Sequence, residues 1–192
     1  DIDKIKNEII SAQIIILQME IPIEVIEYVI NLASKHDVYI ILNAAPACKI
    51  KEEVLSKVNC LVVNETEASF YLNKEINDVK SSIENCQELY GKIKDLLIIT
   101  LGENGSLLYD GKEKLHIKAR KAEVTETTGA GDSFIGAFAY KLLNDSSYQE
   151  AAEFASLVSS ITVTKIGAQD SMPTYEEVKK FAVIDGFLTT AS

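Results

Sequence analysis

The segment from Thr127 to Phe134, Thr-Thr-Gly-Ala-Gly-Asp-Ser-Phe, carries the most chemistry in the sequence. It runs into a stretch with helical apolar spacing, so its amides would lie at a helix N-terminus, where the helix dipole is positive. The small residues Gly129, Ala130 and Gly131 let an anion approach these amides closely. Asp132 in the same turn could take a proton from an attacking hydroxyl. The alternative is a glycine-rich turn in which Asp132 only caps the helix.

A second segment, Asn-Glu-Thr-Glu from Asn64 to Glu67, follows the apolar stretch 60–63. Open α/β sheets bind their ligands at the carboxyl ends of such strands. Asn64 and Glu67 would share one side of a helical turn and could order the water around Mg²⁺ beside a phosphate. The alternative is a capping box, because an Asn and a Glu three residues apart also form that structure.

A third segment, Thr-Leu-Gly-Glu-Asn-Gly, begins at Thr100 after the apolar stretch 96–100. The backbone around Gly102 and Gly105 could lie against the phosphate or ribose of a nucleotide. The alternative is a tight turn, which the same glycines would also allow.

The elements that must position these residues alternate between strands and helices. The apolar patterns predict strands at 14–17, 38–42, 60–63 and 96–100, and a hairpin of 106–110 with 114–118. They predict helices over 3–11, 22–33, 52–58, 65–71, 79–92, 132–143, 149–164 and 174–181. This alternation predicts an α/β fold, with a mostly parallel sheet and helices on both faces, in one domain over residues 1–192.

Composition excludes several classes of function. The 192 residues have a formal net charge of −10, which disfavours nucleic acid and anionic membranes as partners. The sequence has no apolar run near the roughly 20 residues of a membrane span, and residues 1–8 are too charged for a signal peptide. The three cysteines and two histidines are widely spaced, which argues against disulfides and zinc. We therefore expect a soluble, cytoplasmic protein.

The order and spacing of these three segments resemble those in the C-terminal part of the ribokinases, which belong to the PfkB-type carbohydrate kinase family. The resemblance runs over nearly all 192 residues. Its first landmark is Gln-Met-Glu-Ile-Pro at 18–22, and Asn-Ala-Ala-Pro at 43–46 and Ile-Gly-Ala-Gln at 166–169 are further landmarks. It implies a ribokinase-like three-layer α/β/α fold, with the N-terminal half and the β-lid absent from this sequence.

The resemblance also implies an activity, the ATP-dependent phosphorylation of the primary hydroxyl of ribose or a similar small sugar. It implies that Asp132 is the catalytic base, that Gly129 to Gly131 form the anion hole, and that Glu20 contacts the sugar. The residues implied near Mg²⁺, phosphate and nucleotide are Asn64, Glu67, Thr100, Gly102, Gly105 and Ser156. Ser156 stands where the family often has Asn or His, so we expect weaker nucleotide contacts there.

A monovalent-cation site for K⁺ is implied as well. The positions that correspond to it are Glu126, Thr128, Thr162, Lys165 and Gly167, with Ser171 nearby. The family usually has Asp where Glu126 stands. Glu126 is one methylene longer, so its carboxylate is not expected to lie where that of Asp would, and the cation site departs from the family pattern here.

Two other functions stay open at the level of sequence. The protein could phosphorylate another sugar or a nucleoside, or it could be a nucleotide-binding or oligomerising module without catalysis. The expected partners are a small sugar and ATP. An exposed apolar sheet edge would also allow homo-oligomers.

Overall fold

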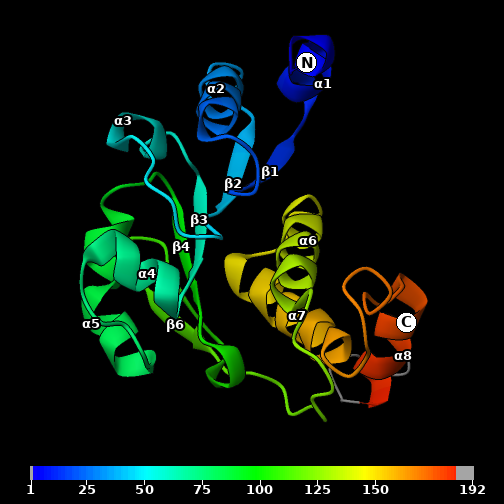
Figure 1. Ribbon diagram of the computed structural model, residues 1–192. Helices are drawn as coiled ribbons and strands as arrows, with labels where there is room; N and C mark the ends of the chain where they lie inside the picture. Colours follow the sequence, from blue (N-terminus) through cyan, green and yellow to red (C-terminus); the bar gives the residue numbers. More distant parts are fainter. Residues whose placement is uncertain (1, 185–192) are drawn as a thin grey trace. The chain divides into compact units, whose positions relative to one another are not determined.

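In the computed structural model, which describes residues 2–184, the strands form a six-stranded sheet in the order β1-β2-β3-β4-β5-β6 (Figure 1). The first four strands are parallel, and β5 and β6 are added antiparallel as a hairpin. The strands are β1 (Ile14–Gln18), β2 (Tyr39–Asn43), β3 (Cys60–Asn64), β4 (Leu96–Thr100), β5 (Ser106–Tyr109) and β6 (Lys114–Ile117). The prediction of a mostly parallel sheet is therefore confirmed.

The chain divides into two compact units, one up to Lys118 and one from Ala119 onward. The N-terminal unit contains the sheet together with η1 (Ile2–Ile5), α1 (Lys6–Ser11), α2 (Ile23–Ala33), α3 (Glu52–Leu55), α4 (Glu65–Leu72), α5 (Val79–Tyr90) and η2 (Gly102–Asn104). The C-terminal unit contains α6 (Ala130–Leu142), α7 (Tyr148–Thr162) and α8 (Tyr175–Ile184). The expectation of a single domain over residues 1–192 stays a prediction.

Alternation along the strands sets which side chains form the core of the N-terminal unit. In β3 and β4, Leu61, Val63, Leu97 and Ile99 join the apolar cluster that includes buried residues of α1 to α5. Successive side chains of a strand point to opposite faces, so these five helices cover one face of the sheet. The residues that alternate with them along the strands, and Asn64 and Thr100 at the strand ends, point to the other face.

Several helices differ from their predicted bounds. Helix α6 begins at Ala130 rather than at 132, because Gly129 already turns the chain and its carbonyl accepts from the Ser133 N–H at 2.9 Å. Helix α3 ends at Leu55 rather than at 58, because the N–H groups of Lys57 and Val58 donate three residues back, as in a tight turn. The helix predicted over 3–11 is divided into a 3₁₀ helix over residues 2–5 and α1, and α8 continues to Ile184 rather than ending at 181. The other elements lie within about two residues of their predicted bounds.

Helices α6 and α7 make up most of the C-terminal unit and pack along each other. The predicted faces are buried at Ile135, Phe138 and Ala139 in α6 and at Ala151, Ala155, Val158 and Thr162 in α7. Phe134 adds its ring, which stacks on that of Phe138. Packing between α6 and α7 therefore supports the first turn of each helix.

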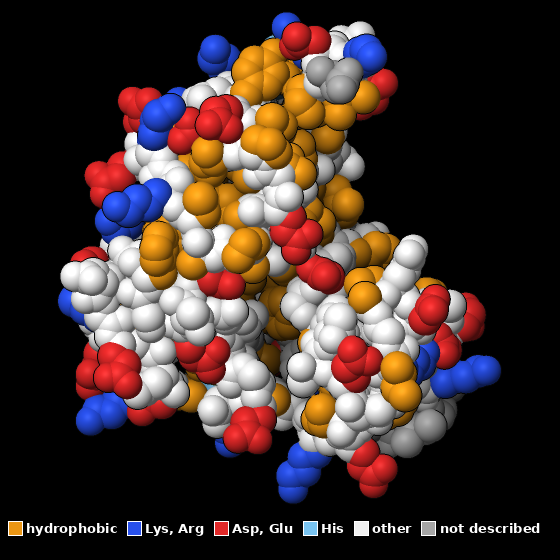
Figure 2. All heavy atoms as spheres, viewed as in Figure 1, with side chains coloured by type: hydrophobic (Ala, Val, Ile, Leu, Met, Phe, Trp, Pro, Cys, Tyr) orange, Lys and Arg blue, Asp and Glu red, His pale blue; other side chains and the backbone are white. Residues whose placement is uncertain are grey.

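Apolar side chains also reach the surface of the N-terminal unit. Figure 2 shows them in the upper part of the molecule, where Figure 1 places α1, β1 and α2. The large exposed apolar residues of this region are Ile5, Ile16, Ile21 and Tyr28. Within residues 2–184, β1 is an edge strand and Ile16 on it is 43% exposed, as expected for an apolar edge. None of the described helices is both long and apolar enough to span a bilayer.

Candidate active site

Polar residues end all four parallel strands of the N-terminal unit. β1 ends at Gln18, β2 at Asn43, β3 at Asn64 and β4 at Thr100. Gln18 lies opposite Asn43, and Asn64 lies opposite Thr100. All four side chains point to the face away from the helices, because Leu17, Leu42, Val63 and Ile99, one residue earlier, face the apolar core. This polar row lies where open α/β sheets bind ligands.

The loop predicted to contact a nucleotide is a short 3₁₀ turn between β4 and β5. The Leu101 N–H donates to the Gly105 carbonyl at 2.8 Å, which closes the turn. Gly105 has φ 91° and ψ −130°, a backbone conformation that residues other than glycine rarely adopt. After it, Ser106 pairs with Thr100 and extends the polar row. The Ser106 hydroxyl is buried and has no hydrogen-bond partner within the described part of the chain.

Asn64 and Glu67 form the capping box that the sequence allowed. The Asn64 side chain accepts from the Glu67 N–H at 2.9 Å, and Glu67 Oε2 accepts from the Asn64 N–H at 2.7 Å. The Asn64 amide Nδ2 donates to the other carboxylate oxygen, Oε1, at 3.0 Å. The two side chains thus fix each other at the carboxyl end of β3, at the start of α4.

Glu67 is a buried carboxyl group, with only 6% of its surface exposed. This burial raises its pKa, and the hydrogen bonds from Asn64 offset part of that effect. Both oxygens already accept a hydrogen bond, which fits contact with a metal ion through water better than direct ligation. Among the described residues, no three acidic, histidine or cysteine side chains come together as a metal site.

Glu20, the predicted sugar ligand, is exposed in the turn after β1. The preceding Met19 N–H donates to the Ala45 carbonyl at 3.0 Å, so this turn is bonded to the segment that follows β2. That segment contains a cis Ala45–Pro46 peptide bond. The role of Glu20 in sugar binding stays a prediction.

In the C-terminal unit, Gly129 is the residue before α6 and has left-handed backbone angles, φ 79° and ψ −5°. A Cβ atom at this position would lie 2.9 Å from the Ala168 carbonyl oxygen, which is too close. Only glycine therefore fits both the conformation and the space. Asp132 lies in the first turn of α6 and is exposed.

Hydroxyl groups from α6 and α7 support this first turn. The Ala130 carbonyl accepts from the Ser133 hydroxyl at 3.0 Å and from the Ser159 hydroxyl of α7 at 3.1 Å. Thr162, fully buried on α7, has its hydroxyl 2.9 Å from that of Ser133. No sequence pattern points to Ser133 or Ser159 in this role, because helical spacing gives no signal of a contact between two helices.

Among the residues predicted around K⁺, the structure brings three together. The Glu126 carboxylate accepts from the Gly167 N–H at 2.9 Å and is hydrogen-bonded to the Thr128 side chain. The Thr128 contact and then the Gly167 contact lower the pKa of Glu126. The N–H groups of Thr125 and Glu126 both donate to the Val163 carbonyl, at 2.8 and 3.2 Å. The loops before α6 and after α7 are therefore bonded to each other.

The remaining predicted residues of this unit have other contacts. The Lys165 ammonium lies 2.8 Å from Glu177 Oε1 and lowers the pKa of Glu177 to about 2, together with contacts from Thr174. The buried Ser171 hydroxyl donates to the Ala168 carbonyl at 2.8 Å. Ser156 is half-buried on α7. Their predicted roles toward cation and nucleotide stay predictions.

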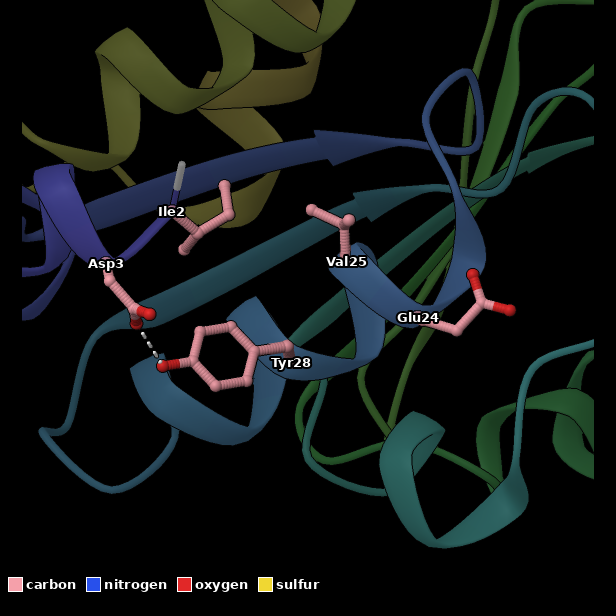
Figure 3. Close-up of a pocket in the computed structure, with 5 residues that line it drawn as sticks. All are labelled: Ile2, Asp3, Glu24, Val25 and Tyr28. Carbon is pink, nitrogen blue, oxygen red and sulfur yellow. Dashed lines mark hydrogen bonds between the residues drawn. The ribbon is translucent and has the colours of Figure 1, made fainter.

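The N-terminal unit has a pocket between η1 and α2 (Figure 3). Its lining is Ile2, Asp3, Glu24, Val25 and Tyr28. The Tyr28 hydroxyl donates to Asp3 Oδ1 at 2.8 Å across it, as the dashed line in Figure 3 shows. None of the predicted site residues lines this pocket, so we do not place the active site there.

Comparison with known proteins shows the family. A model of the pfkB family carbohydrate kinases matches residues 1–175, so the chain belongs to this family. The ribokinase of Staphylococcus aureus (strain COL) is 35% identical over 181 residues, which are 94% of this chain and 60% of that protein. The ribokinase of Haemophilus influenzae is 34% identical, over 91% of this chain and 57% of that protein.

Solved structures confirm the ribokinase-like fold class. The structure of Arabidopsis thaliana ribokinase complexed with ribose and ATP matches with a TM-score of 0.88 at 30% identity, over 93% of this chain and 58% of that one. The ribokinase of Thermotoga maritima matches with a TM-score of 0.80 at 33% identity, over 92% and 58%. The chain thus spans somewhat less than two thirds of the length of these relatives.

Proposed function

We propose that the protein transfers the γ-phosphoryl group of ATP to the primary hydroxyl of ribose or a similar small sugar. Family membership and ribokinase relatives at 34% to 35% identity support this activity. The Arabidopsis relative was solved with both ribose and ATP, which are the two proposed substrates. A cytoplasmic location belongs to the same proposal.

The observation that carries the proposal is the start of α6. The first amides of a helix lack acceptors within the helix. Here the Ala130 N–H donates to the Thr127 carbonyl at 3.2 Å, and the preceding residue, Gly129, has no side chain to cap the amides that follow. Gly129 packs against Ala168, so this backbone is fixed before any ligand binds. Amides fixed in this way would stabilise negative charge that develops on a transferring phosphoryl group.

Asp132 is the proposed base. It lies in the same first turn as these amides and is exposed, so a sugar hydroxyl could reach its carboxylate. The carboxylate would accept the hydroxyl proton as the oxygen attacks phosphorus. Positioning and charge stabilisation supply most of the rate in such transfers, which suits a site built from backbone amides and one carboxylate.

Nucleotide and Mg²⁺ would be held largely by the N-terminal unit. Mg²⁺, when bound, neutralises charge on the phosphates. Glu67 and Asn64 would orient its water ligands, since the capping box fixes both side chains and leaves lone pairs on the Glu67 oxygens. Thr100, Gly102 and Gly105 would contact the nucleotide in this unit. Ser156, in the C-terminal unit, is proposed as a nucleotide contact from the resemblance alone.

Potassium does not fit this chain as the resemblance implied. Glu126 supplies the only carboxylate among the residues predicted to bind it, and that carboxylate is held by the Gly167 N–H and the Thr128 side chain. Lys165 directs its ammonium group to Glu177 instead. We therefore assign no step of the reaction to K⁺.

The replacement Asp132→Asn tests the proposal. It should lower sugar-dependent ADP formation by about 10²- to 10⁴-fold, the usual contribution of a general base. The affinity for a non-hydrolysable ATP analogue with Mg²⁺, measured by calorimetry, should stay within about twofold. Unchanged turnover would show that Asp132 is not the base. Absence of both ATP-analogue binding and sugar-dependent ADP formation in the unmodified protein would overturn the proposed function.

The sugar itself needs a substrate panel. A deoxyribokinase of Salmonella typhi is 29% identical over 94% of this chain, so a 2-deoxy sugar is the second candidate. Comparing kcat/KM for ribose, deoxyribose, fructose and a nucleoside would identify the preferred hydroxyl compound. Exchange of Glu20 for Gln should lower kcat/KM for the preferred sugar without changing ATP-analogue affinity.

A further inference from the structure

The Glu126 side chain joins the two loops that surround the start of α6. It belongs to the loop before α6, and its Oε2 accepts at 2.9 Å from the N–H of Gly167, in the loop after α7. The same carboxylate is hydrogen-bonded to the Thr128 side chain. We propose that Glu126 is a positioning residue that fixes the start of α6 with its own carboxylate, and that this protein therefore needs no monovalent cation at this place.

The start of α6 depends on the loop that Glu126 holds. Gly129 lies against the Ala168 carbonyl, one residue beyond Gly167, and this contact leaves no room for a Cβ atom. A shift of Gly167 would therefore also move the support of Gly129 and of the amides that follow it. The effect on catalysis rests on the proposed function, whereas the connection between the loops does not.

The charge of Glu126 is balanced by hydrogen-bond donors rather than by a cation. The Thr128 side chain and the Gly167 N–H both stabilise the ionised carboxylate. Lys165, the lysine of the same loop, is paired with Glu177 at 2.8 Å. Two donors on one carboxylate give a stable arrangement without any added ion.

The length of the side chain at position 126 decides whether its carboxylate reaches the Gly167 N–H. An aspartate at position 126 would withdraw the carboxylate by about 1.5 Å, the length of one carbon–carbon bond. The carboxylate would then lose the Gly167 N–H, and an anionic space lined by carboxylate, hydroxyl and carbonyl oxygens would open between the loops. Such oxygen-lined space suits K⁺. The variant Glu126→Asp should therefore acquire the potassium dependence that the present chain lacks.

The test compares the unmodified protein with Glu126→Asp, Glu126→Gln and Glu123→Asp. Glu123→Asp is the matched control, because Glu123 is an exposed glutamate three residues earlier in the same loop. Hydrogen exchange at the Gly167 amide and at residues 129–131, and the thermal midpoint, are measured in KCl and in choline chloride at equal ionic strength. A calorimetric titration with a Mg²⁺-bound ATP analogue follows in both salts.

We expect the unmodified protein and Glu123→Asp to behave alike in both salts. In Glu126→Asp, exchange at Gly167 should be faster by about tenfold or more in choline chloride and should slow again in KCl. Glu126→Gln keeps the side-chain length and an acceptor for Gly167, so it should show no response to K⁺.

Two results would overturn the proposal. One is a K⁺ response of exchange or thermal midpoint in the unmodified protein. The other is a Glu126→Asp variant that matches the unmodified protein in both salts or that K⁺ fails to restore. If the K⁺ response of Glu126→Asp holds while no protein binds the ATP analogue, the proposed function fails and the role of Glu126 stands.

Discussion

The starts of α4 and α6 differ in whether side chains cap their first backbone amides. The sequence predicts phosphate or metal chemistry at both starts, and both helices begin with backbone amides that need acceptors. At α4, Asn64 and Glu67 satisfy each other through three hydrogen bonds. At α6, Gly129 precedes the helix, so the cap position provides no side-chain acceptor.

The difference shows which start is suited to an anion. At α4 the Glu67 N–H is already bonded to the Asn64 side chain, and the Glu67 carboxylate beside it would repel a phosphate. At α6 the Ala130 N–H donates to the Thr127 carbonyl at 3.2 Å, and Gly129, held against Ala168, adds no side-chain cap to the amides that follow. This difference supports the proposed phosphoryl site at α6 and the proposed site of a hydrated metal ion at α4.

Exchange of Gly129 for Ala should have the largest effect. The left-handed φ of 79° and the 2.9 Å approach to Ala168 predict a loss of about 1–3 kcal/mol in the free energy of unfolding. Affinity for the ATP analogue should fall by about tenfold or more. The control is Gly136→Ala, in the exposed middle of α6 with no atom near its Cβ position, which should gain up to about 1 kcal/mol. Equal behaviour of the two variants would contradict the assignment.

Removal of the Asn64 cap should have the next largest effect. Asn64→Ala should cost about 1 kcal/mol of stability, the usual value of an N-cap. The matched control is Ser147→Ala, because Ser147 and Glu150 form the corresponding capping box of α7. Both variants should lose similar stability in urea unfolding. Only Asn64→Ala should also raise the Mg²⁺ concentration needed for ATP-analogue binding, and if Ser147→Ala raises it equally, Asn64 is a cap and nothing more.

The pH dependence of stability should distinguish the buried Glu67 from the exposed Glu177. Burial raises the pKa of Glu67 above its usual 4.5, so its stabilising contribution is present below that value and is lost as pH rises through the raised pKa. Lys165 lowers the pKa of Glu177 to about 2, so its contribution is present above 4.5 and is lost as pH falls toward 2.

These two contributions are measured as differences in the free energy of unfolding between the unmodified protein and Glu67→Gln or Glu177→Gln, across a range of pH. The two differences should change with pH in opposite directions. High salt should diminish the Glu177 effect, which arises at the surface, and leave the Glu67 effect nearly unchanged. A Glu67 difference that is flat with pH would show that the group is not buried as described.

Ser106→Ala should have the smallest effect. Its buried hydroxyl has no partner among the described residues, so its removal should raise the free energy of unfolding by up to about 1 kcal/mol. ATP-analogue affinity should not change. A clear loss of affinity would indicate that the nucleotide supplies the missing partner, and the polar row would then extend functionally to β5.

Much of the fold could be predicted from the sequence because its signals are local. Apolar runs such as 96–100 and the glycine between 106–110 and 114–118 are enough to locate strands and a hairpin. The capping box of Asn64 and Glu67 is also local, since its two residues are three positions apart. The end of α3 was misjudged, because a tight turn and a helix have the same apolar spacing over one turn.

The site itself could be predicted only in part. Resemblance to the family gave the residue types around α6, but the contact between Gly129 and Ala168 joins residues 39 positions apart. No periodicity signals that Ser159 supports Ala130, or that Gln18, Asn43, Asn64 and Thr100 end their strands on one face. Such contacts depend on strand register and helix packing, which sequence spacing does not specify.

The sequence by itself determined the strand–helix alternation, the acidic composition and the chemical character of each loop. Those properties depend on side-chain type and on spacing within one element, which can be read along the chain. Only the tertiary structure decided that the Glu126 carboxylate takes the Gly167 N–H. The physical reason is that a hydrogen bond across 41 residues exists only when packing of α6 against α7 has brought both loops to within bonding distance.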